Sequence, residues 1–324
     1  MERKLADATF LDGAVAELCG PRTAAFFDKC QQLIPWAQLA APLRDLYEDN
    51  GAGGRPAWPL VLMVKCLMLQ KWFSLSDPQL EELLQDRLSF RRFVGLSLTE
   101  DTPDETTFVR FRQRLLAHHH GRTLFDRVLS HLDRHGLVLK GGTIVDATII
   151  EAPLGRPRSG GGSTRDPEAS HTYKHRRTYH GYKAHIATDR HGVIKDYRFG
   201  AASEHDATYF EELTAGEKTA VYGDTAYRSA AREAGLEQRG VLAGIIHKRV
   251  KGQTRLVPAD RRRNRWLGRI RAVVEHPFAW IKNMGHRRTR YRGRLRNALD
   301  FGLVAAAYNL KRSFSLMTPA RAVT

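Results

Sequence analysis

The first part of the chain has the hydrophobic periodicity of α-helices up to about residue 138. A Ser-Asp-Pro segment at 76–78 is typical of a helix start, and the residues after it place Leu80 and Leu84 on one apolar face. A second start is expected at Thr102, which has capping-box spacing to Glu105. The pattern therefore predicts an all-helical N-terminal domain over residues 1–138.

After residue 138 the pattern changes to short runs rich in β-branched residues. The sequence predicts a strand at 143–150, a hairpin around the turn 189–192, and further strands ending near 224 and 246, with short helices between them. Two helices, at 266–283 and 297–313, are expected to follow. Strands followed by a mixed β and α order indicate an α/β domain over residues 139–315, with a mixed sheet flanked by helices.

Two stretches of this second domain lack periodicity. Residues 151–172 are rich in Gly, Ser and Pro, which predicts a mobile loop after the first strand. Residues 248–265 are predicted to form a basic loop, and residues 316–324 a tail.

Two acidic residues follow or interrupt apolar strands, where a carboxylate is costly unless it is paired or binds a cation. Asp146 lies inside the run 143–150 and shares a strand face with Thr148, and Asp224 ends a later strand. Neighbouring strands of one sheet can bring such residues together, which makes the pair a candidate site for Mg²⁺. Two such ions about 3.5–4 Å apart can activate an attacking oxygen and stabilise a leaving one.

A third acid, Glu275, lies in a predicted helix between two bases. At ~100° per residue, Arg271, Glu275 and Lys282 project within about 40° of one another. This face can offer one metal ligand between two phosphate-binding side chains. Pro277 is expected to kink or weaken the helix near Glu275.

Each of these acids also has an ordinary structural interpretation. Asp146 can be a hydrogen-bonded strand residue, Asp224 a helix N-cap, and Glu275 an ion-pair partner one turn from a base. Spacing alone does not decide between these interpretations and a catalytic triad. Other acids compete for the same role, namely Glu151, Asp189 and Asp206.

The positive charge of the chain is concentrated in its last quarter. From Val241 onward there are 20 Lys and Arg residues against three acidic ones, which accounts for the whole formal net charge of +17. The most apolar stretch contains Lys65 and is too short for a membrane span, so nucleic acid is the expected partner. The three cysteines lack metal or disulfide spacing and no signal peptide is visible, which favours the cytoplasm.

The order and spacing of these motifs resemble bacterial insertion-sequence DDE transposases of the insertion-sequence-five group. VDATIIEAP resembles the first-acid strand of that family, HGYKAHIATDRHGVI its next hairpin, and VYGDTAYRS its second-acid motif. Arg271, Glu275 and Lys282 fit its Arg-x3-Glu-x6-Lys helix, and residues 56–96 and 102–115 are similar to its helical N-terminal domain.

The resemblance implies an RNase H-like catalytic domain in which Asp146, Asp224 and Glu275 are the catalytic residues and hold two Mg²⁺ ions, with Mn²⁺ as a substitute. It implies binding of the element's terminal inverted repeats and of target DNA, cleavage, and joining of 3′-hydroxyl ends. Residues 1–138 would bind DNA and dimerise, and a homodimer or larger assembly would act on the bacterial nucleoid. The 51 residues between Asp224 and Glu275 leave little room for the large β-rich insertion of some relatives.

Basic residues of both domains are the expected DNA contacts. They are Arg110, Arg112 and Arg114 in the first domain, and Lys183, Arg261, Arg262, Arg263, Arg265, Arg271, Lys282, Arg287, Arg288 and Arg290 in the second. Many relatives have a Tyr three residues before the helix Arg, where this chain has Gly268. Two other functions share the same acids or the same charge: a stand-alone metal-dependent nuclease, and a non-catalytic DNA-binding repressor.

Overall fold

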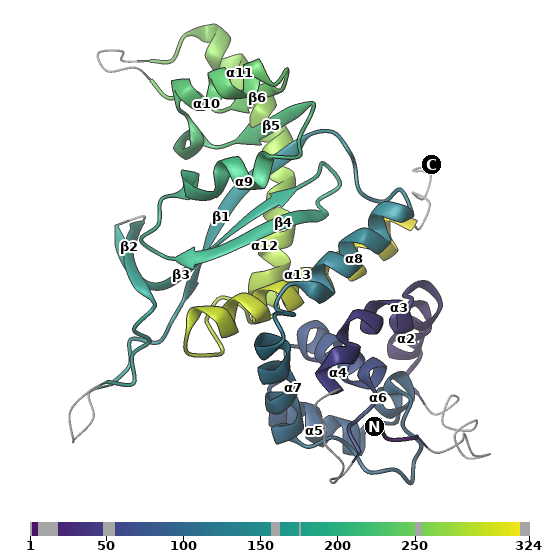
Figure 1. Cartoon of the computed structure of the whole chain (residues 1–324). Helices are drawn as coiled ribbons and strands as arrows, with labels where there is room; N and C mark the ends of the chain where they lie inside the picture. The colour runs from purple at the N-terminus through teal and green to yellow at the C-terminus, as the bar shows by residue number, and fades with distance from the viewer. Residues whose placement is uncertain are drawn as a thin grey trace. The chain divides into compact units, whose positions relative to one another are not determined.

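The computed structural model in Figure 1 describes residues 2–5, 19–47, 56–156, 163–174, 176–249 and 255–317. The chain divides into two compact units. The first contains Met1–Val128 and Gly302–Phe314, and the second contains Leu129–Phe301 and Ser315–Thr324. The change of sequence pattern predicted a domain boundary at residue 138. It did not predict that part of the last helix belongs to the first unit.

The first unit is helical and packs around α4, which is buried along nearly all of its length. A buried cation near α2 is satisfied internally, since Lys65 Nζ donates to Gln31 Oε1 at 3.0 Å and to the Phe93 carbonyl at 2.9 Å. No helix of the described residues is long and apolar enough to cross a membrane. The elements are α2 (Pro21–Leu33), α3 (Trp36–Ala40), η1 (Ala41–Tyr47), α4 (Leu60–Phe73), α5 (Asp77–Asp86), α6 (Leu88–Val94), α7 (Glu105–Ala117) and α8 (Thr123–Arg134).

The predicted helix starts are confirmed in one case and corrected in the other. Ser76 caps α5 in a capping box with Gln79, as the sequence predicted. For α7 the cap is Asp104 and not Thr102, because the Asp104 carboxylate accepts the Thr107 N–H at 2.6 Å. The proline after Thr102 keeps that residue in extended backbone, before the helix can begin.

The second unit is built on a six-stranded mixed sheet. Its main path is β2-β3-β1-β5-β6, and β4 also pairs with β3. The β3 strand is antiparallel to β1, β2 and β4, whereas β5 is parallel to β1 and β6. This order confirms the expected mixed sheet flanked by helices. The strands are β1 (Thr143–Glu151), β2 (Ser170–Lys174), β3 (Arg177–Thr188), β4 (Ile194–Ala201), β5 (Ala220–Gly223) and β6 (Leu242–Ile245).

Helices cover both faces of this sheet (Figure 1). On one face Val145 packs with Phe210 of α9 and Leu236 of α10 in a buried cluster. On the other face Trp266 of α11 meets Tyr222 of β5 edge to face, with ring centroids 6.4 Å apart. The elements are η2 (Asp206–Tyr209), α9 (Phe210–Thr214), η3 (Thr225–Tyr227), α10 (Ala230–Gln238), α11 (Pro258–Arg271), η4 (Ala272–Val274), α12 (Glu275–Asn283) and α13 (Arg294–Met317), of which residues 302–314 belong to the first unit.

The predicted loops are shorter in the structure. The basic loop expected over 248–265 overlaps α11, which begins at Pro258 with proline at its first position, and residues 250–254 of that loop lie outside the described residues. The loop expected over 151–172 gives way to β2 at Ser170, and its residues 157–162 lie outside the described residues. The helix α13 extends to Met317, and residues 318–324 of the expected tail also lie outside them.

The helix predicted over 266–283 is divided by one 3-10 turn. Pro277 lacks the N–H that would bond to the Val273 carbonyl, and the chain forms η4 over 272–274 in that place. The expected disturbance near Glu275 is therefore present, and Glu275 is the first residue of α12.

Glu217 fixes the beginning of β1 against β5. Its buried carboxylate accepts the Thr143 hydroxyl at 2.6 Å and the Thr219 hydroxyl at 2.7 Å, and Lys195 Nζ lies 3.3 Å from it. Burial opposes the charge, but these hydrogen bonds and Lys195 outweigh it and lower the pKa of Glu217 to about 2.

Glu217 should make the free energy of unfolding depend on pH in the acid range. Its pKa lies below the ordinary value, so its stabilisation is complete above about pH 4.5 and is lost as the pH falls towards about 2. The free energy of unfolding of the Glu217→Gln variant should be lower by up to ~3 kcal/mol at neutral pH, and this difference should shrink over that window. Denaturant unfolding at a series of pH values measures both; a difference independent of pH would contradict the assignment.

Candidate active site

The pairing of β1 with β5 brings two of the predicted acids together. The two strands run parallel, with Thr143 opposite Val221 and Ile144 opposite Tyr222. Two residues further along the same register, Asp146 is level with Asp224. Because side chains alternate along a strand, both project from the face opposite to the apolar cluster of α9 and α10.

All three predicted acids line one cavity of about 590 Å³ in the second unit. The cavity opens beside the part of β1 that extends past the end of β5, and α12 closes its other side. It is lined by Asp146, Ala147, Thr148, Ile149, Glu151, Lys174, Tyr179, Asp224, Arg271, Glu275, Phe278, Lys282 and Arg287.

Asp146 is the most constrained of these acids. Its Oδ2 accepts a hydrogen bond from Arg271 at 3.1 Å, and its Oδ1 accepts the Ala147 N–H at 2.8 Å. Burial raises the pKa of Asp146; the Ala147 N–H and Arg271 oppose this rise, and the charges of Asp224 and Glu275 add to it. Burial is the largest of these effects, so the charged form of Asp146 is disfavoured in this site.

The structure supports the helix-cap interpretation of Asp224 and does not support the ion-pair interpretation of Glu275. Asp224 does cap a helix, since it accepts the Ala226 N–H at 2.7 Å at the start of η3, and it lines the cavity as well. Arg271 forms its ion pair with Asp146 on the sheet and not with Glu275 on its own helix face. The 3-10 turn η4 lies between Arg271 and Glu275, so they are not one regular α-helical turn apart.

The donor chemistry of the cavity fits a hard divalent cation. Carboxylate oxygens are the ligands that Mg²⁺ prefers, and a cation would offset the cost of burying the Asp146 charge, which is the main reason that its pKa is raised. Among the described residues, however, no three His, Cys, Asp or Glu side chains are grouped closely enough to hold an ion as they stand. Cation binding would require rearrangement, including release of Asp146 by Arg271.

Two of the three competing acids have structural partners, whereas the exposed Glu151 lines the cavity together with the predicted triad. Asp189 accepts the N–H groups of His191 and Val193 in the β3–β4 turn, as its place in the hairpin predicted. Asp206 is not a cap, because His205 fills that position; it pairs with Lys183 instead.

Three of the expected DNA contacts are directed into the protein. Arg112 is buried and paired with Asp77, because it lies on the inner face of α7. Lys183 Nζ is held by Asp206 at 2.8 Å and by the Glu204 carbonyl at 2.6 Å. Arg263 donates to two β6 carbonyl groups at 2.7 Å. We therefore remove these three from the expected contacts.

The other expected basic contacts lie on the surface or in the cavity. Arg271 and Lys282 line the cavity together with Arg287. Those with exposed side chains are Arg110, Arg261, Arg262, Arg265, Arg287 and Arg288, and those partly exposed are Arg114 and Arg290.

Sequence reasoning missed two residues of the cavity, Lys174 and Tyr179. Both come from the β2–β3 hairpin, in which Lys174 pairs with Arg177 and Thr172 with Tyr179. The alternation of basic and aromatic residues over 171–180 was the available signal. The region was instead divided between a predicted loop and the start of a strand.

Gly268, which stands where many relatives have a Tyr, has open space beside it. A Cβ built at this residue would meet no atom within 4 Å, so packing does not require glycine there. The neighbouring Trp266, which is 52% exposed, is the aromatic side chain of this helix segment.

Comparison with known proteins identifies the class to which this arrangement belongs. Residues 139–310 match the model of the transposase DDE domain, and residues 19–114 match that of a transposase domain (DUF772). The first match spans more than half of the chain, so the chain belongs to the DDE transposase family. Among solved structures, the chain is similar to the Mos1 strand transfer complex at 14% identity, with 75% of this chain and 82% of that chain covered and a TM-score of 0.22.

The crowded charge at Asp146 predicts an unusual effect on stability. Without divalent cations, Asp146→Asn should raise the melting temperature, because it removes a charge that burial disfavours and that the charges of Asp224 and Glu275 also repel. The matched variant Asp189→Asn should lower it, since three backbone N–H groups donate to the Asp189 carboxylate. Thermal unfolding in a chelator compares them, and equal destabilisation by both would contradict the crowding.

Proposed function

We propose that the chain is the transposase of a bacterial insertion sequence of the insertion-sequence-five group. It binds the terminal inverted repeats of its element, cleaves the DNA there, and joins the freed 3′-hydroxyl ends to target DNA. The observation that carries this proposal is the cavity lined by Asp146, Asp224 and Glu275, with Arg271 and Lys282 beside them. The family membership supports the general activity.

Two phosphoryl transfers of the same kind account for the reaction. In cleavage, water attacks a phosphorus atom at the element end, the P–O3′ bond breaks, and the 3′-oxygen leaves as a hydroxyl. In joining, that 3′-hydroxyl attacks a target phosphate, and the target P–O3′ bond breaks in turn. One cavity can serve both steps because each is an in-line displacement at phosphorus.

The residues of the cavity have distinct roles in this scheme. Asp146 and Asp224 would share two Mg²⁺ ions, and Glu275 would complete the ligand set of one of them. When bound, the ions supply Lewis acids that activate the attacking oxygen and stabilise charge on the leaving oxygen. Lys282 and Arg287 are placed to hold phosphates, and Arg271 is placed to exchange its bond with Asp146 for one to DNA.

DNA would approach over the exposed face of α11. Arg261 and Arg265 lie one turn apart on this helix, and both are exposed. Lys174 and Tyr179 extend the cavity on the β2–β3 side, where a base and a phosphate can contact them. The homodimeric or larger assembly that would synapse two element ends is part of this proposal.

Substitution of the three acids should abolish both reaction steps. Asp146→Asn, Asp224→Asn and Glu275→Gln should each lower cleavage by ~100-fold or more, since each removes a cation ligand. Glu212→Gln is the matched control, because Glu212 is an exposed acid of α9 that pairs with Arg198. The measurement is strand cleavage and joining with Mg²⁺ on a plasmid that carries this reading frame with its flanking DNA.

The products of that assay separate the alternatives. Cleavage without joined product, or without preference for the element ends, would indicate a nuclease. DNA binding with no cleavage, unchanged by Mg²⁺ and by the three substitutions, would indicate a repressor. Full activity in Asp146→Asn would refute the proposed site.

The exposed arginines of α11 should set the salt dependence of DNA affinity. Arg261→Gln combined with Arg265→Gln should weaken binding and reduce the slope of log affinity against log salt by about 0.9 for each phosphate that the variant no longer neutralises. Arg263→Gln is the comparison, because Arg263 bonds to β6 carbonyl groups and should change stability and not the slope. Filter binding from low to moderate salt measures the slope, and an unchanged slope in the double variant would exclude this surface.

A further inference from the structure

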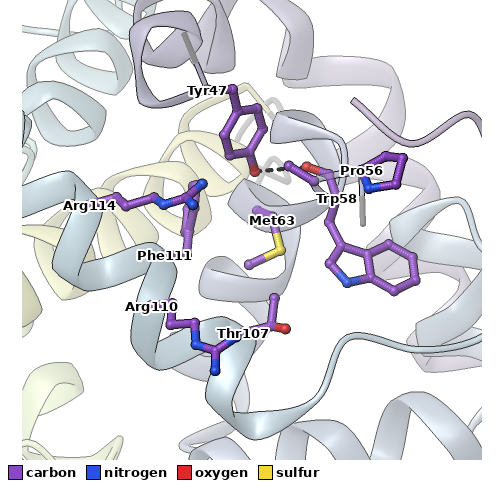
Figure 2. Close-up of a pocket in the computed structure, with 9 residues that line it drawn as sticks. Tyr47, Pro56, Trp58, Met63, Thr107, Arg110, Phe111 and Arg114 are labelled. Carbon is purple, nitrogen blue, oxygen red and sulfur yellow. Dashed lines mark hydrogen bonds between the residues drawn. The ribbon is translucent and has the colours of Figure 1, made fainter. Parts of the chain in front are cut away.

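The helical unit contains a second cavity, which the proposed chemistry does not use. It has a volume of about 200 Å³ and lies between α7 and the segment that leads into α4 (Figure 2). We call it the α7 pocket. It is lined by Tyr47, Pro56, Ala57, Trp58, Met63, Thr107, Arg110, Phe111 and Arg114.

The walls of the α7 pocket are aromatic and apolar, and their positions are fixed by contacts. The Tyr47 hydroxyl donates to the Trp58 carbonyl at 2.8 Å, which joins the end of η1 to the segment before α4. The guanidinium of Arg3 lies 4.4 Å from the centroid of the Trp58 ring and holds this ring in place. Figure 2 shows Met63 between Trp58 on one side and Phe111 on the other.

The rim of the pocket is cationic. Arg110 and Arg114 are one turn apart on α7, and Arg114 lies 5.8 Å from the centroid of the Tyr47 ring. The lining residues include these two arginines and no acid, whereas Arg3, which stacks on Trp58, is paired with Asp101 outside the lining. The pocket therefore combines flat apolar surfaces with an excess of positive charge.

This combination selects a ligand that has a flat ring and an attached anion. Aromatic side chains stack on a nucleobase whatever its sequence, and guanidinium groups bind phosphate with two parallel hydrogen bonds. A base inside a duplex is stacked on its neighbours and cannot enter a concave pocket. An unpaired nucleotide can, and a cavity of about 200 Å³ accommodates one base.

We propose that the α7 pocket binds one unpaired nucleobase of DNA, stacked against Trp58, with the adjoining phosphate held by Arg110 and Arg114. The proposal rests on the proposed function in taking DNA as the partner. It adds a specific site for an unpaired nucleotide within the helical unit, which was expected to bind DNA.

Fluorescence of 2-aminopurine tests this site without any catalytic step. The full-length protein is titrated, in a chelator, into a duplex that carries 2-aminopurine in a short single-stranded overhang. Stacking should quench the probe in the overhang and leave the same probe unchanged in a fully paired duplex. Trp58→Ala should weaken binding of the overhang by ~5-fold or more, and Trp58→Phe should retain most of the quenching.

Arg110→Gln keeps the test independent of whether Trp58→Ala folds, because Arg110 is exposed. It should weaken overhang binding by ~10-fold, whereas Arg22→Gln, an exposed arginine of α2 outside the pocket, should match the wild type. Equal quenching in paired and unpaired probes, or unchanged binding in Arg110→Gln, would overturn the proposal. Loss of strand joining with normal quenching would instead count against the proposed function alone.

Discussion

The charge of Asp146 is the constraint on which the second unit depends. A carboxylate on a central strand, next to Asp224 and within reach of the charge of Glu275, raises the free energy of the folded chain. The ion pair with Arg271 compensates for part of this cost, and it also joins α11 to the sheet. Proteins retain such a destabilising charge where their chemistry requires it. A structural acid of the same unit, Asp189, is instead stabilised, because three backbone N–H groups donate to its carboxylate.

The position of Asp146 depends in turn on the register of two short parallel strands. Only four residues of β5 are available, and their pairing with β1 covers Thr143 and Ile144. A slip by one residue would turn Asp146 towards the apolar cluster and away from Arg271. Glu217 prevents this slip, because it binds Thr143 at the first residue of β1 and Thr219 directly before β5. A buried polar network outside the cavity therefore positions the acids within it.

Local sequence patterns predicted well the helices and strands that bury one face, because burial of one face gives their sequence a regular hydrophobic period. The β1 strand and the α5 helix start are examples, since alternation and a capping box each specify a local geometry. The beginning of α11 was not predicted, because its arginine-rich first turns have no apolar stripe and their stability comes from contacts such as those of Arg263 with β6. The sequence pattern also did not predict which of the α7 arginine side chains point into the protein. Arg112 and Arg114 are two residues apart on α7, so Arg112 is buried against Asp77 and Arg114 lines the α7 pocket. The cavity members Lys174 and Tyr179 depend on pairing within a hairpin whose turn carried no recognised signal.

If the proposed function holds, the arrangement of charge in the second unit would couple DNA binding to cation binding. The exposed arginines of α11 attract a polyanion over distances of about a Debye length, whereas the three acids of the cavity repel a phosphate at short range. A phosphate can approach the acids closely only when cations offset their charge, and cations are held more tightly when a phosphate supplies further oxygen ligands. By linkage, each partner must then raise the affinity for the other by the same factor. Arg271 is the group on which this coupling acts, because its guanidinium now occupies the oxygen of Asp146 that a cation would take, and a DNA phosphate offers it an equivalent partner.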